Sequence, residues 1–209
     1  MQEYKRYIKY KKLIENNKRP GEITIFISLI CVVLCGFILI IIKSARVSAV
    51  RNRIEMITDI SLTSIFSEYN KELFDVYGLL YIDSSYRGVC KGNEESVKNH
   101  FARYFDTNIS ERDERLYGLK YISSEITDVV LASDNEYESL YRQLRSIPYY
   151  SDYSDNEIEE VIFQIEKDMR EESNSEFDFD NQIESLTVTV YVEDFSGKMY
   201  ECKRSYSLF

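Results

Sequence analysis

The chain has 209 residues, which is enough for one domain of ordinary size beside a membrane anchor. Its formal charge of −10 is unevenly distributed, because residues 1–60 carry eleven Lys/Arg against five Asp/Glu, whereas residues 61–209 carry fifteen against thirty-one. The acidic C-terminal part would repel a phosphate backbone, which excludes nucleic acid as an expected partner, and 18 Tyr with 11 Phe supply too much apolar surface for a disordered chain.

Residues 1–22 form a basic segment, which we interpret as a cytoplasmic tail or a leader. Its first twenty residues hold seven Lys/Arg against Glu3 and Glu15, and they are too long and too interrupted for the start of a secretory signal peptide. Lys/Arg-rich flanks stay on the cytoplasmic side of a membrane. The sequence therefore predicts a cytoplasmic N-terminus and an extracytoplasmic C-terminal head, anchored in the cell membrane by a single span.

Residues 23–42 form an uncharged apolar run, ITIFISLICVVLCGFILIII. A helix of twenty residues is about 30 Å long, which matches the hydrocarbon core of a bilayer. The alternative is a fully buried core helix, but uncharged runs of this length are rare in soluble domains. We predict a transmembrane helix, in which Cys31 and Cys35 act as small apolar residues.

Beyond this run, apolar residues recur at steps of three and four, which predicts one continuous helix to about Tyr77, with Gly78 as its C-terminal stop. Residues 43–77 are therefore assigned to a juxtamembrane amphipathic helix. Its proximal stripe is expected to be an exposed docking surface for partners, and its distal stripe to pack under the sheet of the head. The proximal stripe is Val47, Val50, Ile54 and Ile57; the distal stripe is Leu62, Ile65, Phe66, Tyr69 and Leu73.

Residues 78–209 are predicted to form an α+β head with an antiparallel sheet. β-branched and aromatic residues favour a strand over residues 116–131, and alternation favours a hairpin with strands over residues 185–194 and 198–208 around Ser196-Gly197. The remaining segments indicate a short extended run at residues 79–83, a helix from Asn93 or Ser96 to about Phe105, a helix from Asp134 or Asn135 to before Pro148, and an acidic helix at about residues 156–170.

The sequence offers no constellation typical of an enzyme. His100 is the only histidine and lies among apolar residues with no Ser or Cys in a triad-like setting, which favours a structural or surface role. The sequence contains neither a glycine-rich phosphate loop nor a metalloprotease or serine-hydrolase motif. We therefore expect a protein that is not an enzyme, with no catalytic residue, no cofactor and no small-molecule substrate.

Two further groups of residues were weighed as binding sites. Asp152, Ser154 and Asn156 have the spacing of the first ligands of a calcium loop, but Glu157 replaces the required Gly and Phe163 the required Glu, so we expect a solvated acidic face and no metal. The tyrosines of the same tract, Tyr149, Tyr150 and Tyr153, are expected either to form an adhesive patch or to pack on the sheet.

Cys90 and Cys202 are the two cysteines of the head and lie far apart in the sequence. If the head is outside the cell, these two residues could form a disulfide, although two cysteines do not make a framework and both could equally remain free. No CxxC spacing supports a zinc site.

Two motifs flank the anchor. Residues 19–26 read RPGEITIF, and residues 66–73 read FSEYNKEL. With the apolar segment between them, they resemble the TadE/TadG-like, pilin-related membrane proteins of tight-adherence (type IVb) pilus machinery, in particular a branch of unknown function from Gram-positive bacteria. The resemblance is strongest over residues 19–83 and weaker in the strands.

The resemblance implies a pseudopilin-like plan, in which a leader would be cleaved between Gly21 and Glu22. Prepilin-type substrates place a Glu at the fifth position after the cleaved Gly, whereas this chain has Phe26 there. We therefore expect residues 1–21 to be retained as part of a permanent anchor.

Two hypotheses of function follow. The first is a non-enzymatic, pseudopilin-like structural or assembly component of a tight-adherence pilus or secretion system, whose partners are the membrane and other proteins of that system. The second is an extracytoplasmic sensing or ligand-binding module with a short cytoplasmic tail.

Overall fold

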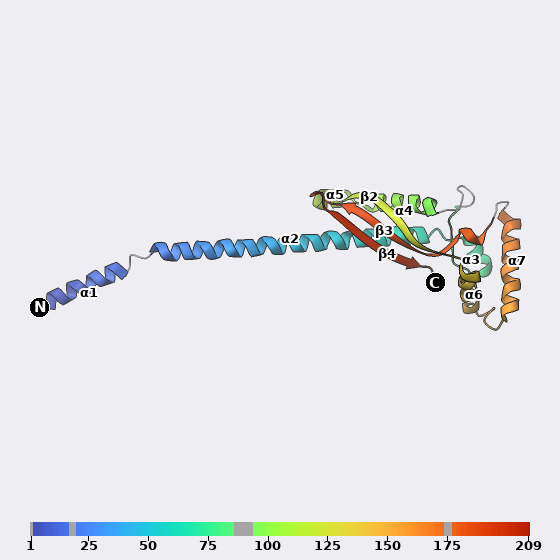
Figure 1. Cartoon of the computed structure of the whole chain (residues 1–209), viewed down its shortest axis with the longest axis horizontal. Helices are drawn as coiled ribbons and strands as arrows, with labels where there is room; N and C mark the ends of the chain where they lie inside the picture. The colour runs from blue at the N-terminus through green and yellow to red at the C-terminus, as the bar shows by residue number, and fades with distance from the viewer. Residues whose placement is uncertain (1, 17–19, 86–93, 174–176) are drawn as a thin grey trace. The chain divides into compact units, whose positions relative to one another are not determined.

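The computed structural model describes residues 2–16, 20–85, 94–173 and 177–209 (Figure 1). The chain divides into two compact units, Met1–Ala49 and Val50–Phe209. The fold is α+β, with one long apolar N-terminal helix and a small antiparallel sheet, as the sequence predicts. The second unit begins at Val50, so it includes residues 50–77, which the sequence places before the head.

The first unit is helical. It holds α1 (Gln2–Asn16) and the first part of α2 (Pro20–Phe66). Among the described residues one helix, Gly21–Phe66, is long and apolar enough to cross a membrane, and none of its most apolar window is buried. Phe26 is 65% exposed and Leu39 66% exposed.

Helix α2 ends at Phe66 and does not continue to Tyr77, which corrects the sequence-based expectation. After Phe66 the chain leaves the helix, because Tyr69 pairs with Ile82 in an isolated bridge and the Asn70 N–H donates to the Tyr81 carbonyl at 2.7 Å. The Asn70 side chain then caps a new helix, α3 (Lys71–Tyr77), by accepting from the backbone N–H groups of its first turn. Gly78 ends α3 in the left-handed conformation, so the predicted stop is confirmed.

The sheet of the second unit is built around one long strand, β3 (Gln182–Glu193). Strand β2 (Lys120–Leu131) pairs antiparallel with β3, and β4 (Met199–Ser207) and the short β1 (Ile82–Asp83) also pair antiparallel with it. The hairpin of β3 and β4 turns through residues 194–198, where Gly197 has a φ of 75°. This confirms the predicted hairpin and its turn.

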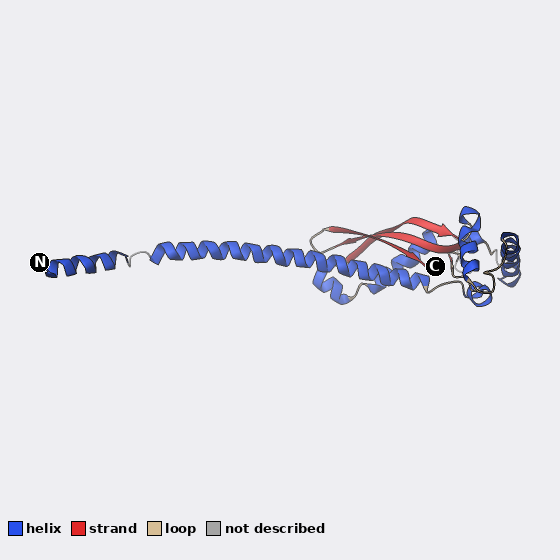
Figure 2. Cartoon of the chain, turned by 90° about the horizontal axis from the view of Figure 1, so that it is seen from below, coloured by secondary structure: helices blue, strands red, loops and turns tan. Residues whose placement is uncertain are grey.

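Helices lie on one side of this sheet, as Figure 2 shows. They are the end of α2, then α4 (Glu94–Asn108) and α5 (Glu111–Tyr117). Six helix-facing residues of β3 and β4 are apolar and buried, whereas Glu201, Lys203 and Ser205 on the other face of β4 are exposed. This alternation is typical of an antiparallel sheet with one dry face. The buried residues are Leu186, Val188, Val190 and Val192 of β3 and Tyr200 and Cys202 of β4.

Helix α5 was not predicted, since residues 116–131 were assigned to strand from Leu116. Ser110 and Asp113 form a capping box at its start: the Ser110 hydroxyl accepts from the Asp113 N–H, and the Asp113 carboxylate accepts from Ser110. Gly118 closes the helix with a φ of 64°. The sequence carries both signals, in Ser110 with Asp113 and in Gly118.

A second hydrophobic core lies at one end of the sheet (Figure 1). It is formed by α3, by α6 (Asp134–Ser146) and α7 (Asp155–Ser173), and by the segment around the 3-10 helix η1 (Phe179–Asn181). Its members include Leu73, Leu140, Leu144, Ile162 and Phe179. This core fixes α6 and α7 side by side.

Candidate functional site: an acidic, aromatic groove between α6 and α7

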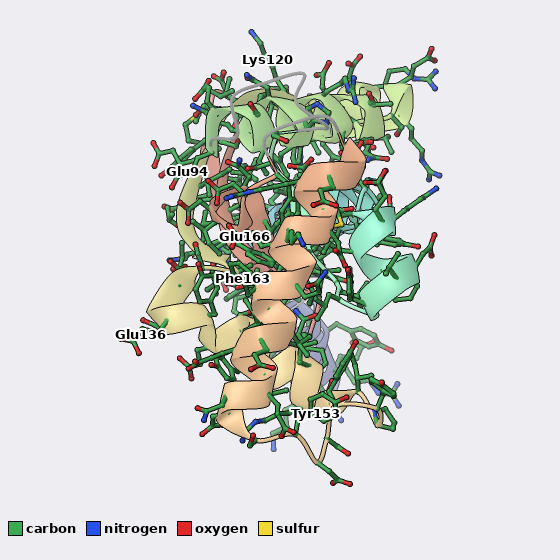
Figure 3. All side chains as sticks on the ribbon, turned by 90° about the vertical axis from the view of Figure 1, so that its right-hand side faces the viewer. Glu94, Lys120, Glu136, Tyr153, Phe163 and Glu166 are labelled. Carbon is green, nitrogen blue, oxygen red and sulfur yellow. The ribbon has the colours of Figure 1, made fainter. Side chains whose placement is uncertain are left out.

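Helix α7 has one buried and one exposed face. Ile158, Ile162, Ile165 and Met169 recur at three- and four-residue steps and lie in the second core. This spacing turns Phe163 outward, where it is 68% exposed. Figure 3 shows Phe163 and Glu166 along α7, with Glu136 on the neighbouring α6.

A groove of about 940 Å³ runs between α6 and α7. Its size is that of a site for a peptide segment or a large ligand. Three aromatic side chains and five carboxylates line it. The aromatic residues are Tyr137, Tyr141 and Phe163; the acidic residues are Glu136, Glu138, Asp155, Glu159 and Glu166; and the basic residues are Arg142 and Arg145.

The rim of the groove includes a left-handed turn at the start of α6. Asn135, Glu136 and Tyr137 have φ angles of 51°, 57° and 66°. Each such residue costs about 1–2 kcal/mol relative to a right-handed one. The turn is held by Asp134, whose carboxylate accepts from the Leu131 N–H at 2.7 Å, and by Tyr137, whose ring lies edge-on to Phe179 with centroids 5.8 Å apart.

The surface of the groove is acidic, because its two arginines are already paired with carboxylates. Arg142 is engaged by the buried carboxylate of Glu184, and Arg145 is engaged by Asp155. Within the described part of the chain, Glu136, Glu138 and Glu159 form no ion pair. A ligand that complements this groove therefore carries positive charge.

Two tyrosines in the groove are held in the protonated form. Burial is the largest cause that raises the pKa of Tyr141, and the neighbouring Glu159 carboxylate adds to it. Burial also raises the pKa of Tyr137, with further contributions from Glu166 and Asp180. Both hydroxyls remain donors at neutral pH, and their rings offer faces to a cationic group.

The proximal stripe of α2 is not an exposed docking surface, which corrects the expectation from the sequence. Val50 is 0% exposed, and Ile54 and Ile57 are each 1% exposed. The reason is that β4 lies against this part of α2: the Thr58 Oγ1 is 3.7 Å from the Cys202 Sγ. Val47, in the first unit, is half-buried.

The distal stripe is mostly buried, but Leu73 lies in the second core with α6 and α7 and not under the sheet, where the sequence places it. Leu62, Ile65, Phe66 and Leu73 are at most 4% exposed, and Tyr69 is half-buried. The Phe66 ring packs against Tyr206 of β4 with centroids 4.7 Å apart.

His100 and the tyrosines Tyr149, Tyr150 and Tyr153 were the other residues considered for a function. His100 Nδ1 lies 3.2 Å from Oε2 of Glu68, and the other carboxylate oxygen, Oε1, accepts from the Tyr104 hydroxyl. Of the three tyrosines, Tyr149 is 72% exposed, while Tyr150 and Tyr153 pack against the second core rather than the sheet.

Ser154, one of the three residues with the spacing of calcium ligands, lies at the start of α7. The Glu157 carboxylate accepts from the N–H and hydroxyl of Ser154 and so caps α7. In the described ranges, no group of three or more His, Cys, Asp or Glu side chains could hold a metal ion.

The two remaining sites are the possible Cys90–Cys202 disulfide and the possible cleavage site after Gly21. Cys202 is buried beside Thr58, whereas Cys90 lies outside the described residues, so their pairing stays a prediction. Gly21 and Glu22 lie in the first turn of α2, and cleavage between them also stays a prediction.

The groove itself was not predicted from the sequence. The signal that points to it is Phe163, an apolar residue on the polar face of an otherwise regular amphipathic helix. No family model, curated protein or solved structure matches this chain.

Proposed function

We propose that this protein is a non-enzymatic, single-pass membrane protein that serves as a pseudopilin-like assembly component of a tight-adherence pilus or secretion system. The observation that carries the proposal is helix α2, which joins an exposed, uncharged apolar run to the core of an α+β unit. A single N-terminal helix that leads from the membrane into an antiparallel sheet is the plan expected from the resemblance of residues 19–83 to TadE/TadG-like proteins.

In this role the first unit anchors the chain, with its basic N-terminus in the cytoplasm, and the second unit meets partners outside. The groove between α6 and α7 supplies the contact. Phe163 provides an exposed apolar anchor, and the surrounding carboxylates select partners with basic side chains. Rim charges of this kind set specificity and association rate more than affinity.

The test is complementation of a deletion strain with the full chain. Phe163→Lys combined with Glu159→Lys should abolish assembly of surface pili, or secretion, while the protein level and membrane fraction stay normal. The matched control is Val76→Lys with Glu201→Lys, which changes one apolar and one acidic exposed residue away from the groove and should complement fully. Equal complementation by both pairs contradicts a role for the groove, and unchanged pili and secretion in the deletion strain contradict the proposed function.

A sensing or ligand-binding module is the second candidate, and the size of the groove favours it. A cationic small molecule that raises the melting temperature of the full chain, together with signalling genes beside this gene, supports sensing. Prepilin peptidase and secretion ATPase genes at that position support the assembly role.

A further inference from the structure

The second unit has an apolar patch at the opposite end of the sheet from the groove, at the turn between β3 and β4 (Figure 1). Phe195 of the turn is 62% exposed, Leu116 of α5 is 53% exposed, and Met199 at the start of β4 is 49% exposed. The Phe195 N–H donates to the Tyr117 carbonyl at 3.2 Å, which places the turn directly against α5. Leu116, Phe195 and Met199, with Lys120 and Lys198, are called the turn face below.

The direction of β4 along α2 shows that the turn face lies at the end of the second unit where α2 enters it. Cys202 lies beside Thr58, and Tyr206 packs on Phe66, so β4 runs in the same direction as α2. The start of β4, with Met199, therefore lies toward Val50, where α2 enters the second unit. The ion pair of Arg53 with Asp113, at 2.7 Å, ties α5 to this same end.

The length of the connecting chain limits how far the start of the second unit, at Val50, can lie from the apolar run. Eight residues of chain lead from Ile42 to Val50, and they span at most about 28 Å even when fully extended. This limit holds for any arrangement of the two units. If residues 23–42 cross a bilayer, the end of the second unit that carries the turn face is tethered close to the lipid surface.

The charges of the turn face suit such a surface. Lys120 pairs across the sheet with Glu193, which in turn pairs with Met199, so one row holds a basic, an acidic and an apolar side chain. Lys198 is exposed in the turn, and its ammonium lies 4.8 Å from the Tyr200 ring centroid. Exposed apolar side chains flanked by lysines are typical of contact with a membrane interface, where the ammonium groups meet the lipid headgroups.

We propose that the turn face docks on the lipid surface beside the anchor, with Phe195 and Leu116 inserted among the upper acyl chains and Lys120 and Lys198 at the headgroups. The inference rests on the membrane anchor of the proposed function. Docking holds the groove between α6 and α7, at the other end of the sheet, away from the bilayer and open to partners.

The chain has no tryptophan, so a single introduced Trp reports on its own surroundings. The experiment uses the full chain in nanodiscs of anionic lipid, with bromine atoms on the upper part of the acyl chains as quencher. Phe195→Trp should emit at shorter wavelength and lose most of its emission to the brominated lipid. Phe163→Trp, equally exposed at the groove, should emit as in water and be quenched by acrylamide and not by the lipid. Phe26→Trp reports on the span.

The outcomes distinguish docking of the turn face from anchoring by residues 23–42. Lipid quenching at Phe26 without quenching at Phe195 or at a second position, Met199→Trp, overturns the docking and leaves the anchor intact. An unquenched Phe26→Trp overturns the anchor itself. Equal lipid quenching at Phe195 and Phe163 also overturns the proposal, because it indicates collapse of the whole unit on the bilayer. Lys120→Glu with Lys198→Glu should reduce the quenching of Phe195→Trp several-fold.

Discussion

At the scale of single residues, the Arg53–Asp113 pair links the stability of the fold to pH. The Asp113 side chain is 5% exposed, and its oxygens accept from Arg53 at 2.7 and 2.8 Å and from Ser110. Burial opposes its ionisation, but these hydrogen bonds outweigh burial and lower the pKa of Asp113 to about 2. The carboxylate is thus bound more tightly by the folded state than by the unfolded chain.

The sign of the pH dependence follows from this shift. The ionised Asp113 stabilises the fold fully above its ordinary pKa of 3.8, and this contribution is lost as the pH falls from 3.8 through 2. It amounts to about 2 kcal/mol. We expect the destabilisation by Asp113→Asn, measured by urea unfolding in detergent, to be larger at pH 6 than at pH 2 by this amount. A difference that does not change with pH would show that the pair contributes through shape alone.

Position 118 requires glycine for two reasons, its backbone conformation and the close approach of Phe195. It has a φ of 64°, and a Cβ at this position would lie 2.5 Å from the Cβ of Phe195. Gly118→Ala should therefore cost about 2–4 kcal/mol, from the left-handed conformation together with the overlap. Gly197→Ala is the control, because its φ is 75° but its nearest atom is 3.5 Å away, so it should cost only about 1–2 kcal/mol. Equal losses in urea unfolding would mean that the turn moves away freely.

At the scale of elements, helix α2 presents two different faces within the second unit. Ile54 is 1% exposed, whereas Met56, two residues along, is 45% exposed. Ile54→Ala should lower the free energy of unfolding by about 2–5 kcal/mol, because it leaves a cavity in the core. Met56→Ala should change it by less than about 0.5 kcal/mol. Similar effects of the two substitutions on thermal unfolding would contradict the burial of this face by the sheet.

Prediction from the sequence succeeded for local features and failed for the packing of α2 against the sheet. Period and capping are local, so they located the hairpin, α7 and the stop at Gly78. The burial of Ile54 and Ile57 depends on β4, which is nearly 150 residues away in the chain. The periodicity of α2 identified its apolar face, but distance from the head along the chain was a poor guide to what covers that face. The groove likewise depends on the packing of two helices, which no single segment encodes.

At the scale of the whole molecule, the state of the N-terminus decides how the anchor is used. Phe26 stands where prepilin-type substrates place a Glu, so we expect the mature protein to keep residues 1–21. Intact-mass spectrometry of the protein purified from native membranes should give a chain that begins at residue 1 or 2. A dominant species that begins at Glu22 would show that a leader is removed, and would favour incorporation into a pilus over permanent anchoring.

The contact between Thr58 and Cys202 joins residues 144 apart in the chain, and this has a consequence for biosynthesis. At about 5–20 residues per second, a ribosome needs about 7–29 s to make the chain between them. During that time the face of α2 with Val50, Ile54 and Ile57 has been made, but the strand that covers it has not. We therefore expect the nascent protein to need a holding chaperone or the export machinery, and a chain that stops before Met199 to be degraded rather than accumulate.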